Sequence, residues 1–475
     1  MASTTGTLPS TASASPAAPS PSPVYYPPAQ ADNSNAPSPL QLQLGNITIV
    51  PVGFMDLTGV WRDKDAGSGI GTSFGSIPYN NATAGKLSEF RFSPQNSRLG
   101  FRIDGDWKGA HFIGYNEFDF LGTSGGNNLG VTNGAFVPRI RLYWVDIRKG
   151  KVEFLAGQSW SMLTPNRKGI SPLPGDLFYS QVMDVNYLAG LTWTRQPGVR
   201  VVFHPTSQVA VGFAAENPDQ YMGGSSGGGS VVLPSALSGL AATEIDNQTN
   251  VLVTPNLVPD FIAKVAADPT SRVHLEVAGI VRTFKLWNTT TGTATSGDYF
   301  TKEGAGGSFN ANVEVVKNFR VVSNNFWSDG GGRYLFGQAP DFAVRSDGSI
   351  SPIHTGGFNE GFEANATKNL LLWGYYGGIY IGRDTALDAN GTTLVGYGYH
   401  GSANSQNRTE QEFTIGFTNT FWKDARYGAL SLIGQYEYAF RDPWYVALGA
   451  PKGTHDNTIY MDVRYTLPGG VPASK

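Results

Sequence analysis

Long segments of this chain alternate apolar and charged side chains. The segment RLGFRIDGDW, residues 98–107, places Leu99 and Phe101 on one parity and Arg98 and Arg102 on the other. Successive side chains of a strand point to opposite faces, so the segment predicts a strand with one apolar and one charged face. Such a strand fits either a soluble sandwich or a membrane barrel with lipid outside and a wet lumen inside.

Similar segments recur to the end of the chain, and the connections between them alternate in length. We expect sixteen strands, at 47–61, 88–104, 110–121, 136–148, 151–158, 187–203, 207–216, 258–267, 271–286, 308–317, 320–328, 356–368, 370–382, 409–422, 425–440 and 456–467. Short turns follow every second strand, and long connections fill the other gaps, at 62–87, 122–135, 159–186, 217–257, 287–307, 329–355, 383–408 and 441–455. Outer-membrane barrels have short turns at one end and long loops at the other, which a sandwich does not require.

The fold class that this pattern predicts is all-β, a transmembrane antiparallel β-barrel of about 16 strands over residues 47–468. Residues 1–46 are rich in Pro, Ser and Ala and are expected to form a disordered tail. Residues 469–475 are expected to form a short C-terminal tail. The first thirty residues show neither the basic nor the apolar region of a secretory signal. How the chain is exported is therefore left open by the sequence.

The charged parity is expected to face the lumen, because Arg or Lys on the lipid face near the midplane costs roughly 2–4 kcal/mol. The expected pore-lining residues are Arg98, Arg102, Arg139, Arg141, Arg200 and Arg282. In PRIRLYW, residues 138–144, the alternation predicts that Ile140, Leu142 and Trp144 face lipid, opposite Arg139, Arg141 and Tyr143. The parity of Arg195 is left open, because Pro197 and Gly198 suggest a bulge.

The connection 159–186 is the predicted constriction, since a long loop without secondary structure is usually functional. Pro165, Pro172 and Pro174 are expected to stiffen it. Its charged side chains, expected to face the arginine wall and set a transverse field, are Arg167, Lys168, Asp176 and Asp184. The alternative is a loop that lies over the barrel mouth with solvated charges.

Composition removes several other function classes. The net charge of -3 gives no case for nucleic-acid binding, and Cys 0 excludes disulfides and thiolate metal sites. The six histidines are scattered without the spacing of a metal or catalytic site. We therefore expect no enzyme, no cofactor and no metal, and no apolar run is long enough for a spanning helix.

The planar fork of Arg binds carboxylates through two hydrogen bonds, so an arginine-lined lumen predicts a preference for carboxylated anions. The function favoured by the sequence is a passive diffusion channel of the bacterial outer membrane for small solutes. Two alternatives stay open: a barrel that acts as an adhesin or envelope tether without an open pore, and a soluble carbohydrate-binding β-protein.

Several phrases occur in an order that resembles the DcaP-like trimeric outer-membrane porins, which are associated with dicarboxylic acid uptake. They are NSRLGFR, LAGQSWS at 155–161, RQPGVR at 195–200, AAENP at 214–218, VPDFIAKV at 258–265, GGGRYL at 330–335 and RYTLP at 464–468. The resemblance implies a 16-stranded barrel in outer-membrane lipid, a homotrimer, small anionic solutes and an inward-folded third loop. The chain departs from the family in its Pro/Ser-rich N-terminal segment, where a coiled coil is expected, and in continuing as GGVPASK after RYTLP.

Overall fold

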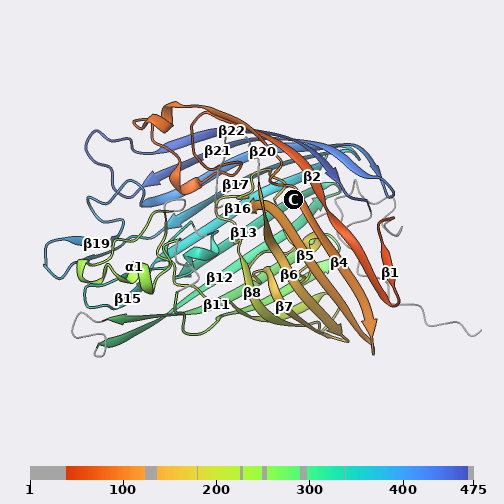
Figure 1. Ribbon diagram of the computed structural model, residues 1–475, viewed down its shortest axis with the longest axis horizontal. Helices are drawn as coiled ribbons and strands as arrows, with labels where there is room; N and C mark the ends of the chain where they lie inside the picture. Colours follow the sequence, from red (N-terminus) through yellow and green to blue (C-terminus); the bar gives the residue numbers. More distant parts are fainter. Residues whose placement is uncertain are drawn as a thin grey trace, which may run out of the picture.

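One antiparallel sheet closes on itself to form the barrel that dominates the structure (Figure 1). The structure is a computed structural model, and it describes residues 39–122, 136–178, 180–224, 228–248, 254–288, 297–336 and 338–468. No helix in this part of the chain is long and apolar enough to cross a membrane.

The elements of the described residues are almost all strands. In chain order the strands of the barrel sheet are β1 (Leu42–Leu44), β2 (Ile47–Arg62), β3 (Glu89–Ser93), β4 (Arg98–Trp107), β5 (Ala110–Gly122), β6 (Val137–Lys149), β7 (Val152–Trp160), β8 (Arg195–Phe203), β9 (Val209–Glu216), β10 (Asp260–Thr270), β11 (Val273–Asn288), β12 (Asp298–Val316), β13 (Phe319–Asp329), β16 (His354–Asn365), β17 (Leu370–Ile381), β20 (Asn407–Asp424), β21 (Gly428–Pro443) and β22 (Thr454–Thr466). Two small hairpins lie in the long loops, β14 (Phe342–Val344) with β15 (Ile350–Pro352) and β18 (Asp384–Leu387) with β19 (Leu394–Tyr397), together with the short helix α1 (Leu240–Thr243).

The barrel closes at β2, which pairs with β4 on one side and with β22, the last strand of the chain, on the other. Its first half pairs with β4, with Phe54 opposite Arg98, and its second half pairs with β22, with Phe54 also opposite Thr466. β3 and β4 continue one another along β2, and Pro94 in the break between them has no backbone N–H to donate. With β3 and β4 counted as one crossing and the three-residue β1 not counted, the described residues make 16 crossing strands, which confirms the prediction.

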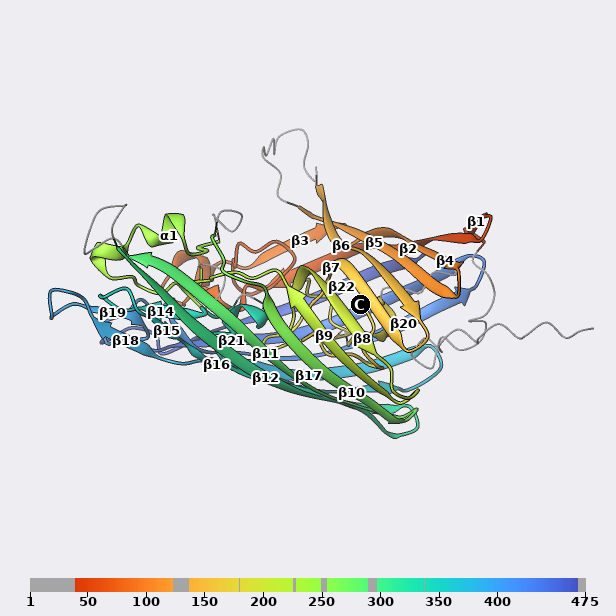
Figure 2. The same ribbon diagram turned by 90° about the horizontal axis from the view of Figure 1, so that it is seen from below.

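Short and long connections lie at opposite ends of the barrel, as predicted. In Figures 1 and 2 the long loops, with α1, β18 and β19, gather at the left end, and β1 lies at the right end with the turns that follow β4 and β10. The turn after β4 is Lys108–Gly109, with φ of 50° and 76°. Glycine adopts such positive φ without steric cost, so the Lys-Gly sequence suits a tight hairpin.

The predicted inward facing of the charged side chains is confirmed on β4, and β22 has the same pattern. On β4, Arg98 is 3% exposed and Leu99 is 47% exposed. On β22, Asp462 and Arg464 are buried while Val463 is exposed. The apolar parity thus forms a belt on the outside of the barrel, and the charged parity points inward.

On β6 the predicted facing is wrong beyond Arg141. The pairing with β5 shifts by one residue, so that Phe118 lies opposite Ile140 and Glu117 opposite Leu142, with Arg141 as the extra residue. A bulge of this kind reverses the parity of everything that follows. Leu142 and Trp144 therefore point inward, 0% and 4% exposed, and Tyr143 points outward, 61% exposed.

Two predicted strands also have different beginnings. β12 begins at Asp298, ten residues before the predicted 308, and β8 begins at Arg195, not at 187. Residues 187–193 resemble a strand because most are apolar, but both parities are buried, since the segment lies inside the barrel. β1 falls within the predicted tail 1–46, and residues 1–38 and 469–475 lie outside the described residues, so the limits of the two tails stay a prediction.

Candidate functional site in the barrel lumen

The third long connection, residues 161–194 between β7 and β8, crosses the interior of the barrel; it is called the lumen loop below. On one side Asn166 donates its backbone N–H to Glu276 on β11 at 3.1 Å. On another side the Tyr460 hydroxyl of β22 donates to Asp184 at 3.1 Å. Because β11 and β22 lie far apart around the sheet, a loop that contacts both lies inside the barrel and not over its mouth.

The four charged residues predicted for this loop have different surroundings. Arg167 is buried in an ion pair with Glu363 of β16, at 2.6 Å. Asp184 is buried and accepts the backbone N–H of Thr72 at 2.8 Å, from the loop that follows β2. Lys168 and Asp176 are half-buried. The loop is thus fixed to the barrel wall by its charges, and its role as a constriction remains a proposal.

Three of the predicted pore-lining arginines form one network with two carboxylates of β5. Arg141 reaches Glu117 and Asp119, each at 2.7 Å. Arg98 lies 3.4 Å from Glu117, and Arg139 lies 2.7 Å from Asp119. Charge pairs of this kind cancel much of the field that unpaired arginines would exert. This wall therefore holds fewer free positive charges than its sequence implies.

Arg195 adds an uncompensated positive charge to the same wall. Its guanidinium lies 5.3 Å from the ring centre of Trp160, which also faces Arg141 at 5.8 Å. It makes no ion pair with any described residue, and its Nη1 atom has no hydrogen-bond partner there. Four guanidinium groups thus face two carboxylates in this network, counting Arg98 and Arg139, which leaves a formal excess of two positive charges.

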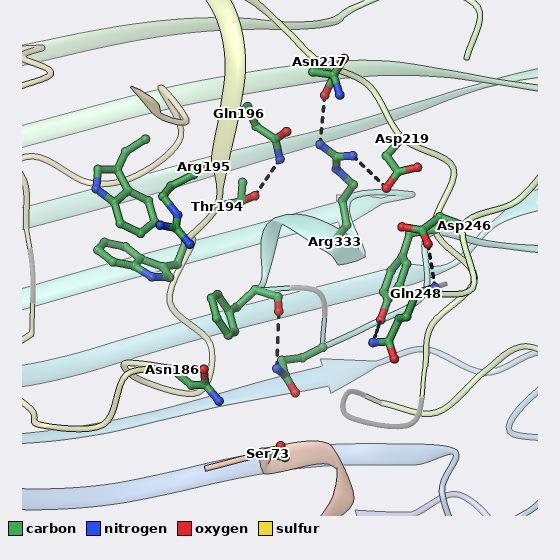
Figure 3. Close-up of a pocket in the computed structure, with 15 residues that line it drawn as sticks. Ser73, Asn186, Thr194, Arg195, Gln196, Asn217, Asp219, Asp246, Gln248 and Arg333 are labelled. Atoms are coloured by element: carbon green, nitrogen blue, oxygen red, sulfur yellow. Dashed lines mark hydrogen bonds and ion pairs between the residues drawn. The ribbon is translucent and has the colours of Figure 1, made fainter. Parts of the chain in front are cut away.

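The predicted bulge at Pro197 and Gly198 is absent. β7 and β8 pair without a shift from Trp160 opposite Arg195 to Val152 opposite Phe203. The side chain of Arg195, the first residue of β8, lies beside the cavity at the loop end of the strand (Figure 3). Without a bulge, Arg195 has the same parity as Val199 and Val201, which are exposed on the outer face, so alternation does not place it inside. Its place on the cavity wall assigns it to the lumen.

The remaining predicted arginines are placed away from this network. Arg102 binds Asp104 through two hydrogen bonds of 2.8 and 2.7 Å on its own strand. Arg282 is buried between Asp260 at 3.1 Å and Asp341 at 2.7 Å. Arg200 is buried within β8.

A cavity of about 540 Å³ lies in the lumen beside the lumen loop (Figure 3). Its wall comes from β7 and β8 and from the loops after β2, β7, β9 and β13. Its lining residues are Ser73, Trp160, Asn186, Trp193, Thr194, Arg195, Gln196, Asn217, Asp219, Tyr221, Asp246, Gln248, Arg333, Phe336 and Gln338. None of the six predicted pore-lining arginines is among these described residues.

The side of the cavity away from Arg195 carries carboxylates. Arg333 lies 3.4 Å from Asp219 and donates to the backbone oxygen of Asn217 at 3.0 Å. Asp246 lies near enough to Asp219 to repel its carboxylate, and it accepts the backbone N–H of Gln248 at 2.6 Å. Burial, more than the neighbouring Asp246, raises the pKa of Asp219 to about 7, although Arg333 opposes the shift.

Backbone strain is concentrated around this cavity. Gln248 and Phe336 line it with φ of 73° and 60°, and Tyr187 of the lumen loop has φ of 64°. Only five non-glycine residues of the described chain have positive φ, and these are three of them. Such strain persists where the surrounding structure holds it, and it is frequent at functional sites.

The residues on this cavity were largely missed by sequence reasoning. Asp219 and Asp246 lie in the connection 217–257. Arg333 lies in GGGRYL, one of the segments that resemble the family, to which the sequence alone assigned no function. Their loops do not alternate, so no parity argument places them. Within the described chain no group of three or more His, Cys, Asp or Glu side chains is arranged to hold a metal ion.

Three solved outer-membrane proteins are similar to this chain. The outer membrane channel DcaP of Acinetobacter baumannii matches with a TM-score of 0.64 and 17% identity, over 89% of this chain and 98% of that one. An anion-selective porin from Comamonas acidovorans matches with a TM-score of 0.49 and 11% identity, over 88% and 99%. OmpF of Salmonella typhi in complex with daunomycin also matches at 0.49, with 9% identity, over 90% and 99%.

Comparisons with protein-family models and with curated protein sequences gave no match. At 17% identity the likeness to DcaP concerns the fold alone. The chain has the fold of an outer-membrane porin, and the predicted resemblance is confirmed at that level.

Proposed function

We propose that this protein is a porin of the bacterial outer membrane, a passive diffusion channel that prefers small carboxylated anions. The barrel fold, the exposed apolar belt and the charged interior support the channel. They also argue against a soluble carbohydrate-binding protein, because a soluble barrel would expose a continuous apolar belt to water, which soluble proteins rarely do. The proposal includes the homotrimer that the family resemblance implies.

The observation that carries the anion preference is Arg195 on the cavity wall without an ion pair in the described chain. A guanidinium group matches the planar carboxylate through two parallel hydrogen bonds. Away from bulk water, its field is less screened than at an exposed surface. Arg333, the other cation on the wall, faces Asp219 and contributes less to the net field.

The lumen loop has the second role in this proposal, as the constriction. Its ion pair between Arg167 and Glu363 and the hydrogen bonds of Asp184 hold it across the barrel. Lys168 and Asp176 are the half-buried charges that a passing solute would meet on the loop. A fixed loop narrows the passage and selects by size before the charged cavity selects by chemistry.

The experiment that tests this function measures flux into proteoliposomes for butanoate and butanamide, which have nearly the same size and differ in charge. We expect the wild-type protein to pass butanoate faster, and Arg195→Gln to bring the two rates together. Arg426→Gln, in the exposed turn between β20 and β21, removes the same charge far from the cavity and serves as the control. If the folded wild-type barrel passes neither solute, the alternative of a tether or adhesin without an open pore replaces this proposal.

A further inference from the structure

We propose that the solute this cavity fits best is zwitterionic and carries a cationic amine in addition to its carboxylate. The inference rests on the proposed porin function and specifies the solute class for the same cavity. It follows from the opposite charges at the two sides of the cavity wall, which lie apart in Figure 3.

The positive side is built around Arg195 and two indole rings. Trp160 and Trp193 lie with their ring centres 3.7 Å apart, and the guanidinium of Arg195 lies over Trp160. The two rings pack beside the side chain of Arg195, whose Nη1 has no hydrogen-bond partner among the described residues. This side therefore presents donors that a carboxylate satisfies.

The negative side holds two carboxyl groups against one guanidinium. Asp219 and Asp246 are 9% and 6% exposed and both line the cavity. Arg333 reaches Asp219 at 3.4 Å, and no described residue forms an ion pair with Asp246. The two carboxyl groups lie close enough to repel one another, and a proton on Asp219 offsets that repulsion. An ammonium group donates three hydrogen bonds and supplies the positive charge in place of that proton.

The space between these sides suits a small solute. Phe336 adds an apolar ring to the cavity wall, and Gln338 and Asn186 add amide groups. The volume of about 540 Å³ falls within the usual range of small-molecule sites, about 300–1,000 Å³. A solute with its carboxylate toward Arg195 extends its other end toward Asp246.

The same arrangement discriminates among carboxylated solutes. A monocarboxylate uses only the positive side, and a dicarboxylate brings its second negative group toward Asp219 and Asp246. Specificity arises as much from this repulsion as from the attraction offered to an amine. The cavity thus ranks a zwitterion above an anion of equal size, although the zwitterion has no net charge.

The test compares proteoliposome flux of γ-aminobutyrate, γ-hydroxybutyrate and glutarate, which share a carboxylate and differ at the other end. We expect the wild-type protein to pass γ-aminobutyrate faster than either anion. In Asp246→Asn, which keeps the shape of the side chain, we expect the ratio of γ-aminobutyrate to γ-hydroxybutyrate flux to fall by about tenfold to a hundredfold, the effect of one charge-assisted hydrogen bond.

The outcomes separate this inference from the proposed function. An unchanged flux ratio in folded Asp246→Asn, or a wild-type protein that prefers γ-hydroxybutyrate, overturns the zwitterion while leaving the anion-preferring porin intact. Loss of the butanoate preference in Arg195→Gln tests the porin separately. Arg426→Gln is again the control and is expected to keep every ratio at its wild-type value.

Discussion

The hydroxyl group of Tyr187 in the lumen loop accepts a hydrogen bond from Nη2 of Arg141 on β6 at 2.9 Å. Arg98 on β4 donates to the same oxygen at 3.0 Å. The ring of Tyr187 packs against Trp193, with centres 3.9 Å apart, and so reaches the wall of the cavity. One side chain thus joins the arginine network, the lumen loop and the candidate site.

Replacing Tyr187 with phenylalanine removes the shared acceptor while keeping the ring. Two buried guanidinium groups then lose a partner, and we expect a loss of about 1–3 kcal/mol in the free energy of unfolding. The measurement is urea-induced unfolding of the detergent-purified barrel. Tyr143→Phe, on the exposed outer face of β6, is the matched control and should change nothing. Equal stability of Tyr187→Phe and wild type would show that the contact does not hold the loop.

The pair formed by Arg167 and Glu363 offers a test of how the lumen loop is held. Arg167→Ala leaves Glu363 buried without its ion pair, although the Tyr375 hydroxyl still donates to it at 2.9 Å. Removing one member of a buried ion pair typically costs about 3–5 kcal/mol. We expect lower stability together with a larger single-channel conductance, because the loop is released from β16. An unaltered conductance would place the narrowest section elsewhere.

The pH dependence of selectivity follows from Asp219, whose pKa is raised to about 7 by burial. A carboxyl group with a raised pKa is neutral below that pH and negatively charged above it. We therefore expect anion preference to be higher at pH 5.5 and to fall as the pH rises through about 7. Asp219→Asn should hold the preference at its low-pH value across the range. A wild-type preference that rises with pH would contradict this assignment.

The bulge in β6 is tested by Tyr143→Arg. Strict alternation places Tyr143 in the lumen, where arginine is tolerated, but the structure places it on the outer belt. An arginine on the lipid face costs roughly 2–4 kcal/mol near the midplane. We expect little heat-modifiable folded protein from Tyr143→Arg and normal amounts from Tyr143→Phe. Normal assembly of the arginine variant would support the unbroken alternation.

Sequence reasoning succeeded where one physical rule acts along a whole strand. The contrast between Arg98 and Leu99 repeats at every second position, because lipid and lumen impose opposite demands on the two faces. This rule predicted the strands and their number, and the alternating lengths of the connections predicted the barrel with its long loops at one end. The predicted facing of Leu142 was wrong, because Arg141 is an extra residue that reverses the parity. No residue in PRIRLYW indicates this bulge.

The candidate site was harder to foresee, since its residues come from loops brought together by the barrel. The length and the prolines of 159–186 predicted a functional loop here. Because residues 187–194 have the composition of a strand, the sequence did not predict that the loop continues to the start of β8. The alternation predicted that Arg98 and Arg141 face the lumen. It did not show that they form ion pairs with Glu117 and Asp119. Arg195 stands out only when these ion pairs are known.

The central claim is that Arg195 supplies the field that favours anions in this channel. The most direct measurement is the zero-current potential of the reconstituted protein across a planar bilayer in a KCl gradient, for wild type, Arg195→Gln and the control Arg426→Gln. We predict an anion-selective potential for wild type and the control, and a clear shift toward the unselective value for Arg195→Gln at unchanged barrel stability. A wild-type potential of the opposite sign, or the same potential in all three proteins, would contradict the account.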